Sequence, residues 1–135
     1  MVQEYRSEIL ERTLRKLHVV VEGIKASVIV NVDGLLVASF PPGNEKDPED
    51  NPTSSPQVAA MAATLSGLAE NTLSRLAQGK LDRILMEGEE GVMLIYPAGQ
   101  AASVAVLLDK NARLDRVFYA TSRAAEEVSS ILSAS

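Results

Sequence analysis

Hydrophobic positions recur at helical spacing in three stretches of the chain, and strand-like apolar runs lie between them. The middle stretch, Val58 to Gln78, places apolar residues three and four positions apart, which predicts an amphipathic helix. The same spacing predicts a first helix over residues 4–18 and a last helix over residues 114–132. The apolar stripe of the middle helix, which we expect to pack on a sheet, consists of Val58, Met61, Ala62, Leu65, Leu68, Ala69, Thr72 and Leu76.

The opposite face of the middle helix is built from small, uncharged residues. They are Ala60, Ala63, Thr64, Gly67, Asn71 and Ser74. A glycine inside a helix costs about 1 kcal/mol relative to alanine, so Gly67 is expected to have a packing reason. One interpretation is a binding surface for a second copy or another protein. The other is an alanine-rich helix whose outer face is poorly optimised. The absence of charge favours the binding surface.

The strand-like runs predict one sheet. Residues 26–40 form two β-rich runs around Asp33-Gly34, a hairpin signal, and Asp33 is interpreted as a turn residue rather than a catalytic carboxylate. Three further strands are expected over residues 80–87, 92–99 and 102–109, and the unbroken apolar character of the last one indicates a central strand. Because tight turns join antiparallel strands, the sequence predicts an α+β fold in which helices sandwich a single five-stranded antiparallel sheet.

A Pro- and acid-rich segment separates the second strand from the middle helix. Residues 41–56 hold five of the six prolines together with four acids, which predicts a flexible, exposed loop. The acids do not follow the spacing of a calcium-binding EF-hand loop. The chain of 135 residues suits one domain spanning 1–135, with this loop as its irregular part.

Composition excludes several classes of function. The chain has no Cys, so disulfides, thiolate catalysis and Cys-bound zinc are excluded. A net charge of -5 argues against nucleic-acid binding, which depends on basic side chains. No apolar run approaches the ~18 residues of a membrane span, and the amino terminus lacks an apolar signal core. We therefore expect a cytoplasmic protein that does not insert into a membrane.

The sequence carries no recognisable catalytic constellation. Its single histidine, His18, falls near the end of the first helix and is interpreted as a neutral packed or exposed residue. Neither phosphate-binding glycine motif is present, and there is no nucleophile elbow. Five arginines are interpreted as surface salt-bridging residues rather than arginine fingers that reach into a GTPase: Arg75, Arg83, Arg113, Arg116 and Arg123. We expect a protein that is not an enzyme and has no catalytic residue, cofactor or metal.

Three segments resemble the roadblock/dynein light-chain family, and its prokaryotic members in particular. They are the hairpin SVIVNVDGLLVAS, the helix AAMAATLSGLAENTLSRL and the strand GKLDRILME. The resemblance implies a dimer in which the third strands join edge to edge into a ten-stranded sheet, with the middle helices side by side. The edge residues implied here are Leu81, Arg83, Leu85 and Glu87.

The resemblance also implies a partner. In the prokaryotic members the paired middle helices contact a Ras-like GTPase in its GTP state. Carried over to this sequence, the contact residues are Ala60, Ala63, Thr64, Gly67 and Asn71. The 41–56 loop is long for the family, and it is open whether it gates the partner, docks it or is inert.

Three functions follow for comparison. The first is a non-enzymatic dimeric regulator or scaffold of a Ras-like GTPase, including a GTPase-activating protein. The second is a structural dimeric adaptor subunit. The third is a ligand-sensing domain, which predicts a pocket between sheet and helix.

Overall fold

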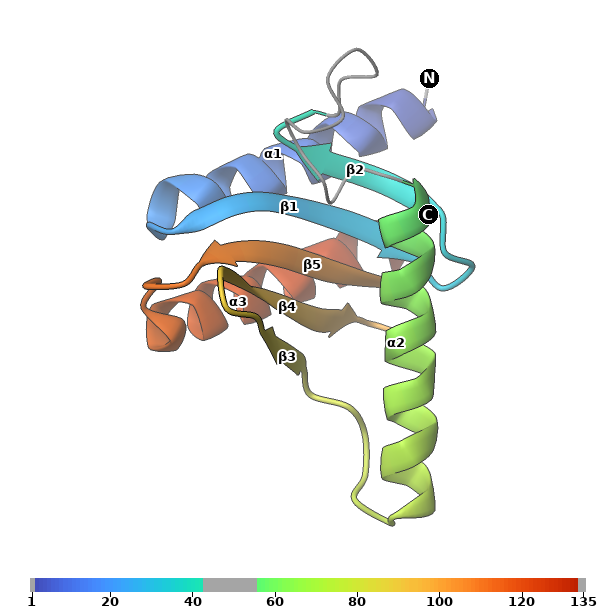
Figure 1. Cartoon of the computed structure of the whole chain (residues 1–135). Helices are drawn as coiled ribbons and strands as arrows, with labels where there is room; N and C mark the ends of the chain where they lie inside the picture. The colour runs from blue at the N-terminus through green and yellow to red at the C-terminus, as the bar shows by residue number, and fades with distance from the viewer. Residues whose placement is uncertain (1, 43–55, 134–135) are drawn as a thin grey trace.

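The computed structural model describes residues 2–42 and 56–133, and its helices and strands follow in the predicted order (Figure 1). The 41–56 loop falls almost wholly outside these described residues. The helices are α1 (Val2–Val20), α2 (Pro56–Arg75) and α3 (Leu114–Ser133). The strands are β1 (Ile24–Asn31), β2 (Leu36–Phe40), β3 (Ile84–Glu87), β4 (Gly91–Ala98) and β5 (Ala102–Asp109).

The five strands form one antiparallel sheet in the order β2-β1-β5-β4-β3, which confirms the predicted fold class. β5 lies in the centre between β1 and β4, as its continuous apolar sequence indicates. The predicted hairpin is also confirmed. Its turn is held by Asn31, whose Oδ1 accepts hydrogen bonds from the backbone N–H of Asp33 and of Leu35, each at 3.0 Å. Gly34 follows at φ +85°, a conformation that L side chains rarely adopt.

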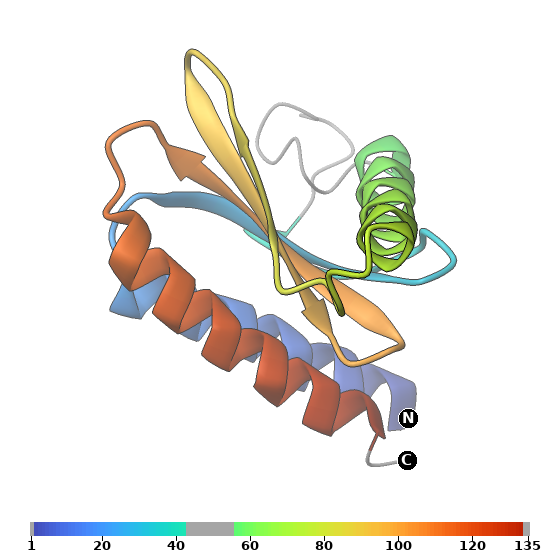
Figure 2. The same ribbon diagram turned by 90° about the horizontal axis from the view of Figure 1, so that it is seen from below.

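α1 and α3 lie side by side and cover one face of the sheet (Figure 2). Large aliphatic side chains fill the space between them and the strands, among them Leu10, Leu14, Leu94, Val117 and Val128, which are all fully buried. Because these residues recur at helical and strand spacing, this core was predictable from the periodicity alone.

α2 covers the other face, and it is the only helix on that face among residues 2–42 and 56–133 (Figures 1 and 2). It runs across the strands, and its carboxyl-terminal turns extend past the sheet on the side of β3 (Figure 1). Its buried residues are small: Ala59, Ala62 and Ser66. Ala59 and Ala62 pack with Val28, Val30, Ile95 and Ala105 from the strands in a second, smaller core.

The predicted apolar stripe of α2 is wrong in part. Ala62 is buried and Leu65 is half-buried against the second core, but Met61, Leu68 and Leu76 are 62–63% exposed. The helix is rotated relative to the prediction, because the small residues Ala59 and Ser66 allow its backbone to approach the sheet closely. The larger side chains consequently lie on one flank of the helix and past its end.

Two element boundaries also differ from the prediction. α1 continues through the β-branched residues Val19 and Val20, so it is longer than residues 4–18. β3 is shorter than the predicted strand over residues 80–87, because only Ile84–Glu87 pair with β4. Among the described residues, no helix combines the length and apolar character needed to cross a bilayer.

Candidate protein-interaction surfaces

The predicted partner residues lie together on the outward side of α2. Ala60, Thr64, Gly67 and Asn71 are exposed, and Ala63 is half-buried. A Cβ atom added at Gly67 would find no other atom within 4 Å. The packing reason expected for Gly67 is therefore not found within the described part of the chain. Thr64 Oγ1 donates to Ala60 O at 2.9 Å, so its hydroxyl is satisfied within the helix. The result is an uncharged helix surface with short side chains.

The tip of the β1–β2 hairpin extends this surface with two residues that the sequence analysis missed. Val32 is 63% exposed and Leu35 is 64% exposed. The hairpin reaches α2 at Gly34, where an added Cβ would lie 3.2 Å from Ala60 Cα. The signal for them was two apolar side chains flanking a tight turn, which normally carries polar residues. We call Val32, Leu35, Ala60, Thr64, Gly67 and Asn71 the hairpin–helix surface.

A second exposed apolar region lies on α2, at helical spacing from the half-buried Leu65. It consists of Met61, Leu68 and Leu76, and we call it the apolar flank. Leu65 joins it to the sheet, since that half-buried side chain packs against the second core, as Ile84, Met86 and Met93 also do. Isolated exposed apolar residues are common, but a row of them continuous with a half-covered core marks an interaction site.

The predicted dimer residues lie in the edge strand β3 and in the segment just before it. β3 hydrogen-bonds to β4 on one side, and within the described residues no strand pairs with its other side. Leu85 and Glu87 are exposed there, and Leu81 and Arg83 lie in the segment that leads into the strand. An open strand edge is a template for pairing with another chain.

Two aromatic side chains hold Arg83. Its guanidinium lies 4.2 Å from the centroid of the Phe118 ring, and Arg83 Nη1 donates to Tyr96 Oη at 3.4 Å. The prediction of Arg83 as a salt-bridging residue is thus replaced, within the described chain, by a cation–π contact with α3. Arg113 does pair with a carboxylate, as predicted: its Nη2 lies 3.3 Å from Asp115 Oδ2, and this hydrogen bond lowers the pKa of Asp115.

A cavity of about 970 Å³, lined by both polar and apolar residues, lies between α2 and the ends of β4 and β5. Ser66 and Ser103 are 9% exposed in its wall, and Glu70, Lys80 and Gln100 surround its mouth. Ser66 Oγ donates to Ala62 O at 3.0 Å. The cavity is open because the residues of α2 beside it, Ala63 and Gly67, have short or no side chains.

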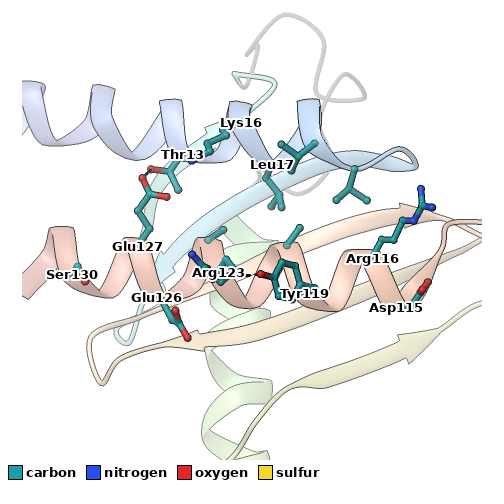
Figure 3. Close-up of a pocket in the computed structure, with 14 residues that line it drawn as sticks. Thr13, Lys16, Leu17, Asp115, Arg116, Tyr119, Arg123, Glu126, Glu127 and Ser130 are labelled. Atoms are coloured by element: carbon teal, nitrogen blue, oxygen red, sulfur yellow. Dashed lines mark hydrogen bonds between the residues drawn. The ribbon is translucent and has the colours of Figure 1, made fainter.

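A groove of about 890 Å³ runs between α1 and α3 on the opposite side of the molecule (Figure 3). Two pairs of polar side chains contact each other within it. Thr13 Oγ1 donates to Glu127 Oε1 at 3.3 Å, and Arg123 Nη1 donates to Tyr119 Oη at 3.5 Å (Figure 3). Because these side chains already bind one another, we assign no catalytic role to the groove.

His18 lies half-buried where α1 meets the sheet. Its Nε2 is 2.9 Å from Ser27 Oγ, and its ring meets the Phe40 ring edge-on at 4.7 Å. Burial lowers the pKa of His18, and a hydrogen bond with the backbone of Ile24 opposes this in part. This environment agrees with the interpretation of His18 as a neutral packed residue. Over residues 2–42 and 56–133, no group of three or more His, Asp or Glu side chains is placed to hold a metal ion.

The sequence matches the Roadblock/LC7 domain over residues 10–108. The chain belongs to this family. It is 35% identical over 119 residues to an uncharacterized protein of Methanocaldococcus jannaschii, covering 88% of this chain and 96% of that protein. A second uncharacterized protein of the same organism is 34% identical over 119 residues, with the same coverage. The roadblock resemblance found in the sequence is thereby confirmed.

Solved structures of roadblock proteins share the fold. Myxococcus xanthus MglB superposes with a TM-score of 0.77 at 15% identity, covering 92% of this chain and 94% of that one. An MglB with a tetrameric arrangement gives 0.76 at 18% identity, with 93% and 89% covered. A Roadblock/LC7 domain from Streptomyces avermitilis gives 0.76 at 21% identity, with 90% and 96% covered. At these identities the likeness concerns the fold.

Proposed function

We propose that this roadblock chain is a dimeric regulator or adaptor that binds a Ras-like small GTPase in its GTP state. The observation that carries the proposal is the hairpin–helix surface, an exposed area of short or apolar side chains on α2 and the neighbouring hairpin tip, where Asp33 is the charged residue. Membership of the family and the MglB neighbours support a role with small GTPases. A GTP-loaded partner would place the chain in the cytoplasm.

The geometry supports a dimer as the binding unit. In this dimer, one second copy would cover both the open edge of β3 and the apolar flank of α2. Joining two β3 edges would extend the sheet and bring the two apolar flanks toward each other. The hairpin–helix surface lies on the other side of α2 and would remain accessible. The five predicted contact residues of α2 are then left for the GTPase, and Leu81, Arg83, Leu85 and Glu87 for the dimer.

A regulator of this kind would not supply catalytic groups itself. No cationic side chain occurs among the hairpin–helix residues, so the surface offers nothing to neutralise charge on a transferring phosphoryl group. An activating effect would therefore come from repositioning the GTPase's own residues. An adaptor would bind the GTPase without changing its hydrolysis rate.

The test is affinity capture with the immobilised chain from lysate loaded with GDP or with a non-hydrolysable GTP analogue. We expect retention of a small GTPase mainly with the GTP analogue, because equal binding of both states would exclude a state-selective role. Gly67→Arg should abolish retention, since an arginine would stand on the open surface of the helix. Ser7→Arg, an exposed substitution on α1, is the matched control and should retain the GTPase.

Single-turnover hydrolysis by the retained GTPase then separates the two roles. A faster rate with the wild-type chain, lost with Gly67→Arg, identifies an activator. An unchanged rate identifies an adaptor. Absence of any GTPase from both samples would overturn the proposal.

The cavity beside α2 favours a second candidate, the ligand-sensing domain. The two buried serines and the surrounding polar side chains converge as a small polar ligand would require. Thermal unfolding with a panel of amino acids and sugars tests it, because a ligand that binds the folded state raises Tm. Ser103→Leu should remove one of the two buried hydroxyls and narrow the cavity, and should therefore reduce any such shift.

A further inference from the structure

We propose that two copies of this chain pair through β3 in one register, with the two-fold axis at Leu85, so that Arg83 of each copy lies opposite Glu87 of the other. This inference rests on the proposed dimer and specifies its pairing. It follows from the direction of the backbone groups of β3, the faces on which its side chains lie, and the charges at its two ends.

The hydrogen-bond pattern of the β3–β4 hairpin shows which backbone groups point outward. Gly88 N donates to Gly91 O at 2.8 Å, which makes these two residues a hydrogen-bonded pair. Along an antiparallel ladder such pairs alternate with non-hydrogen-bonded ones, and the β3–β4 register has no shift. Ile84 and Met86 therefore direct their N–H and C=O groups toward β4. Leu85 and Glu87 direct theirs to the open edge.

Side-chain direction restricts the register further. Ile84 pairs with Ile95 of the second core, so Ile84 and Met86 lie on the α2 side of the sheet. Leu85 and Glu87 consequently lie on the α1–α3 side, as does Arg83, which contacts Phe118 of α3. In a continuous sheet, residues opposite each other lie on the same face. A symmetric antiparallel pair must therefore place its two-fold axis at a residue, and the strand offers Ile84, Leu85 or Met86.

Only the axis at Leu85 matches the chemistry of every pair. It sets Leu85 against Leu85, Ile84 against Met86 and Arg83 against Glu87. An axis at Met86 would set Leu85 against the Glu87 carboxylate. An axis at Ile84 would set the Arg83 guanidinium against Leu85. Apolar and opposite-charge cross-strand pairs stabilise a sheet, whereas mismatched pairs do not.

The two charged residues lie on the face of the sheet that this pairing requires. The contacts of Arg83 with Phe118 and Tyr96 fix the guanidinium on the α1–α3 side, and they use one of its five N–H donors. Glu87 is exposed and makes no ion pair with the described residues. The pair occurs twice in the dimer because of the two-fold symmetry.

Cysteine cross-linking tests the position of the axis, and the absence of native Cys makes it clean. Residues in a hydrogen-bonded antiparallel pair have Cα atoms about 5.5 Å apart, within the range that a disulfide bridges. We expect Leu85→Cys to form a covalent dimer under mild oxidation. Ile84→Cys and Met86→Cys alone should remain uncross-linked, whereas a mixture of these two variants should cross-link. Efficient dimers of Met86→Cys alone or Ile84→Cys alone would overturn the register.

Charge exchange tests the ion pair independently. Arg83→Glu and Glu87→Arg should each weaken the dimer by about tenfold or more, since each creates two like-charge pairs. The double variant R83E/E87R should recover to within about threefold of the wild-type Kd. Exchange with the neighbouring acid, R83E/E89R, is the matched control and should not recover. Equal recovery in both double variants would show that net charge, not this pair, governs association.

Light scattering of the wild-type chain distinguishes failure of the proposed dimer from failure of its proposed register. A monomer at every concentration would overturn the proposed dimer itself. A stable dimer without the Leu85→Cys cross-link and without R83E/E87R recovery would leave the dimer standing and overturn its register.

Discussion

The two faces of the sheet are closed in different ways. On one face, α1 and α3 together bury large aliphatic side chains, and Leu10, Leu14, Val117 and Val128 are all 0% exposed. On the other face, α2 alone buries Ala59, Ala62 and Ser66 and leaves Met61, Leu68 and Leu76 in solvent. Both faces belong to the same strands, so the difference lies in the helices and not in the sheet.

This difference shows which face of the sheet has its large apolar side chains buried within a single copy. Burial of apolar area stabilises the fold by roughly 25 cal/mol per Å², so the α1–α3 face carries most of the stability of a single copy. On the other face, three of the large apolar side chains of α2 stay outside the core: Met61, Leu68 and Leu76. A helix with this arrangement gains little from its own sheet and has much to gain from a partner.

Truncating a large side chain on each face sharpens the comparison and should give the largest effect. Leu14→Ala should lower the free energy of unfolding by about 2–5 kcal/mol, because it leaves a cavity in the closed core. Met61→Ala makes the same kind of truncation on a helix, but at a site 62% exposed. It should cost under about 0.5 kcal/mol in dilute solution. Urea unfolding of both variants measures the difference, and equal costs would contradict the distinction between the faces.

Making the apolar flank polar should instead affect association. Met61→Ser combined with Leu68→Ser removes two exposed apolar side chains per copy, so we expect the dimer Kd to rise by about a hundredfold. Unfolding of the dilute chain should change little. The control is Tyr119→Ser, an equally exposed aromatic residue on α3. Sedimentation velocity over a concentration series measures the Kd, and loss of the dimer in the Tyr119 variant would place the interface on the wrong face.

Alanine substitutions at Gly67, within α2, and at Gly34, in the β1–β2 turn beside α2, should change the free energy of unfolding in opposite directions, each by about 1 kcal/mol. Gly67→Ala should stabilise the chain, because alanine favours helix and nothing lies within 4 Å of the new Cβ. Gly34→Ala should destabilise it, because the residue has φ +85° and its Cβ would lie 3.2 Å from Ala60 Cα. Thermal unfolding of the two variants provides the comparison. Destabilisation by Gly67→Ala would mean that the outer face of α2 is packed after all.

The sequence predicted the closed face better than the open one, for a physical reason. Leu10, Leu14 and Leu17 are buried because large apolar residues at helical spacing form one stripe, and that stripe packs against the core. The same rule failed for Met61 and Leu68, since it ranks residues by hydrophobicity while α2 packs through its smallest side chains. Val32 and Leu35 were missed because their proximity to α2 depends on the hairpin reaching across the fold. The cavity at Ser66 and Ser103 likewise joins residues distant in sequence.

The pH dependence of stability provides the smallest effect, at the edge of the closed face. Burial lowers the pKa of His18 below its ordinary value of 6.5, so the folded state holds a proton less readily than the unfolded state. As pH falls below 6.5, the unfolded state takes up a proton that the folded state resists, and stability decreases. Stability from this residue is fully present above that pH.

Urea unfolding at pH 7.5 and pH 5.5 measures this contribution, with His18→Gln as the matched variant. Glutamine retains a hydrogen-bonding group that can reach Ser27 but does not titrate, so the variant should lose less stability than the wild-type chain over this interval. Carboxylates titrate alike in both proteins and cancel in the difference. An identical pH dependence would contradict this prediction, because it would show that His18 is as well solvated in the folded chain as in the unfolded one.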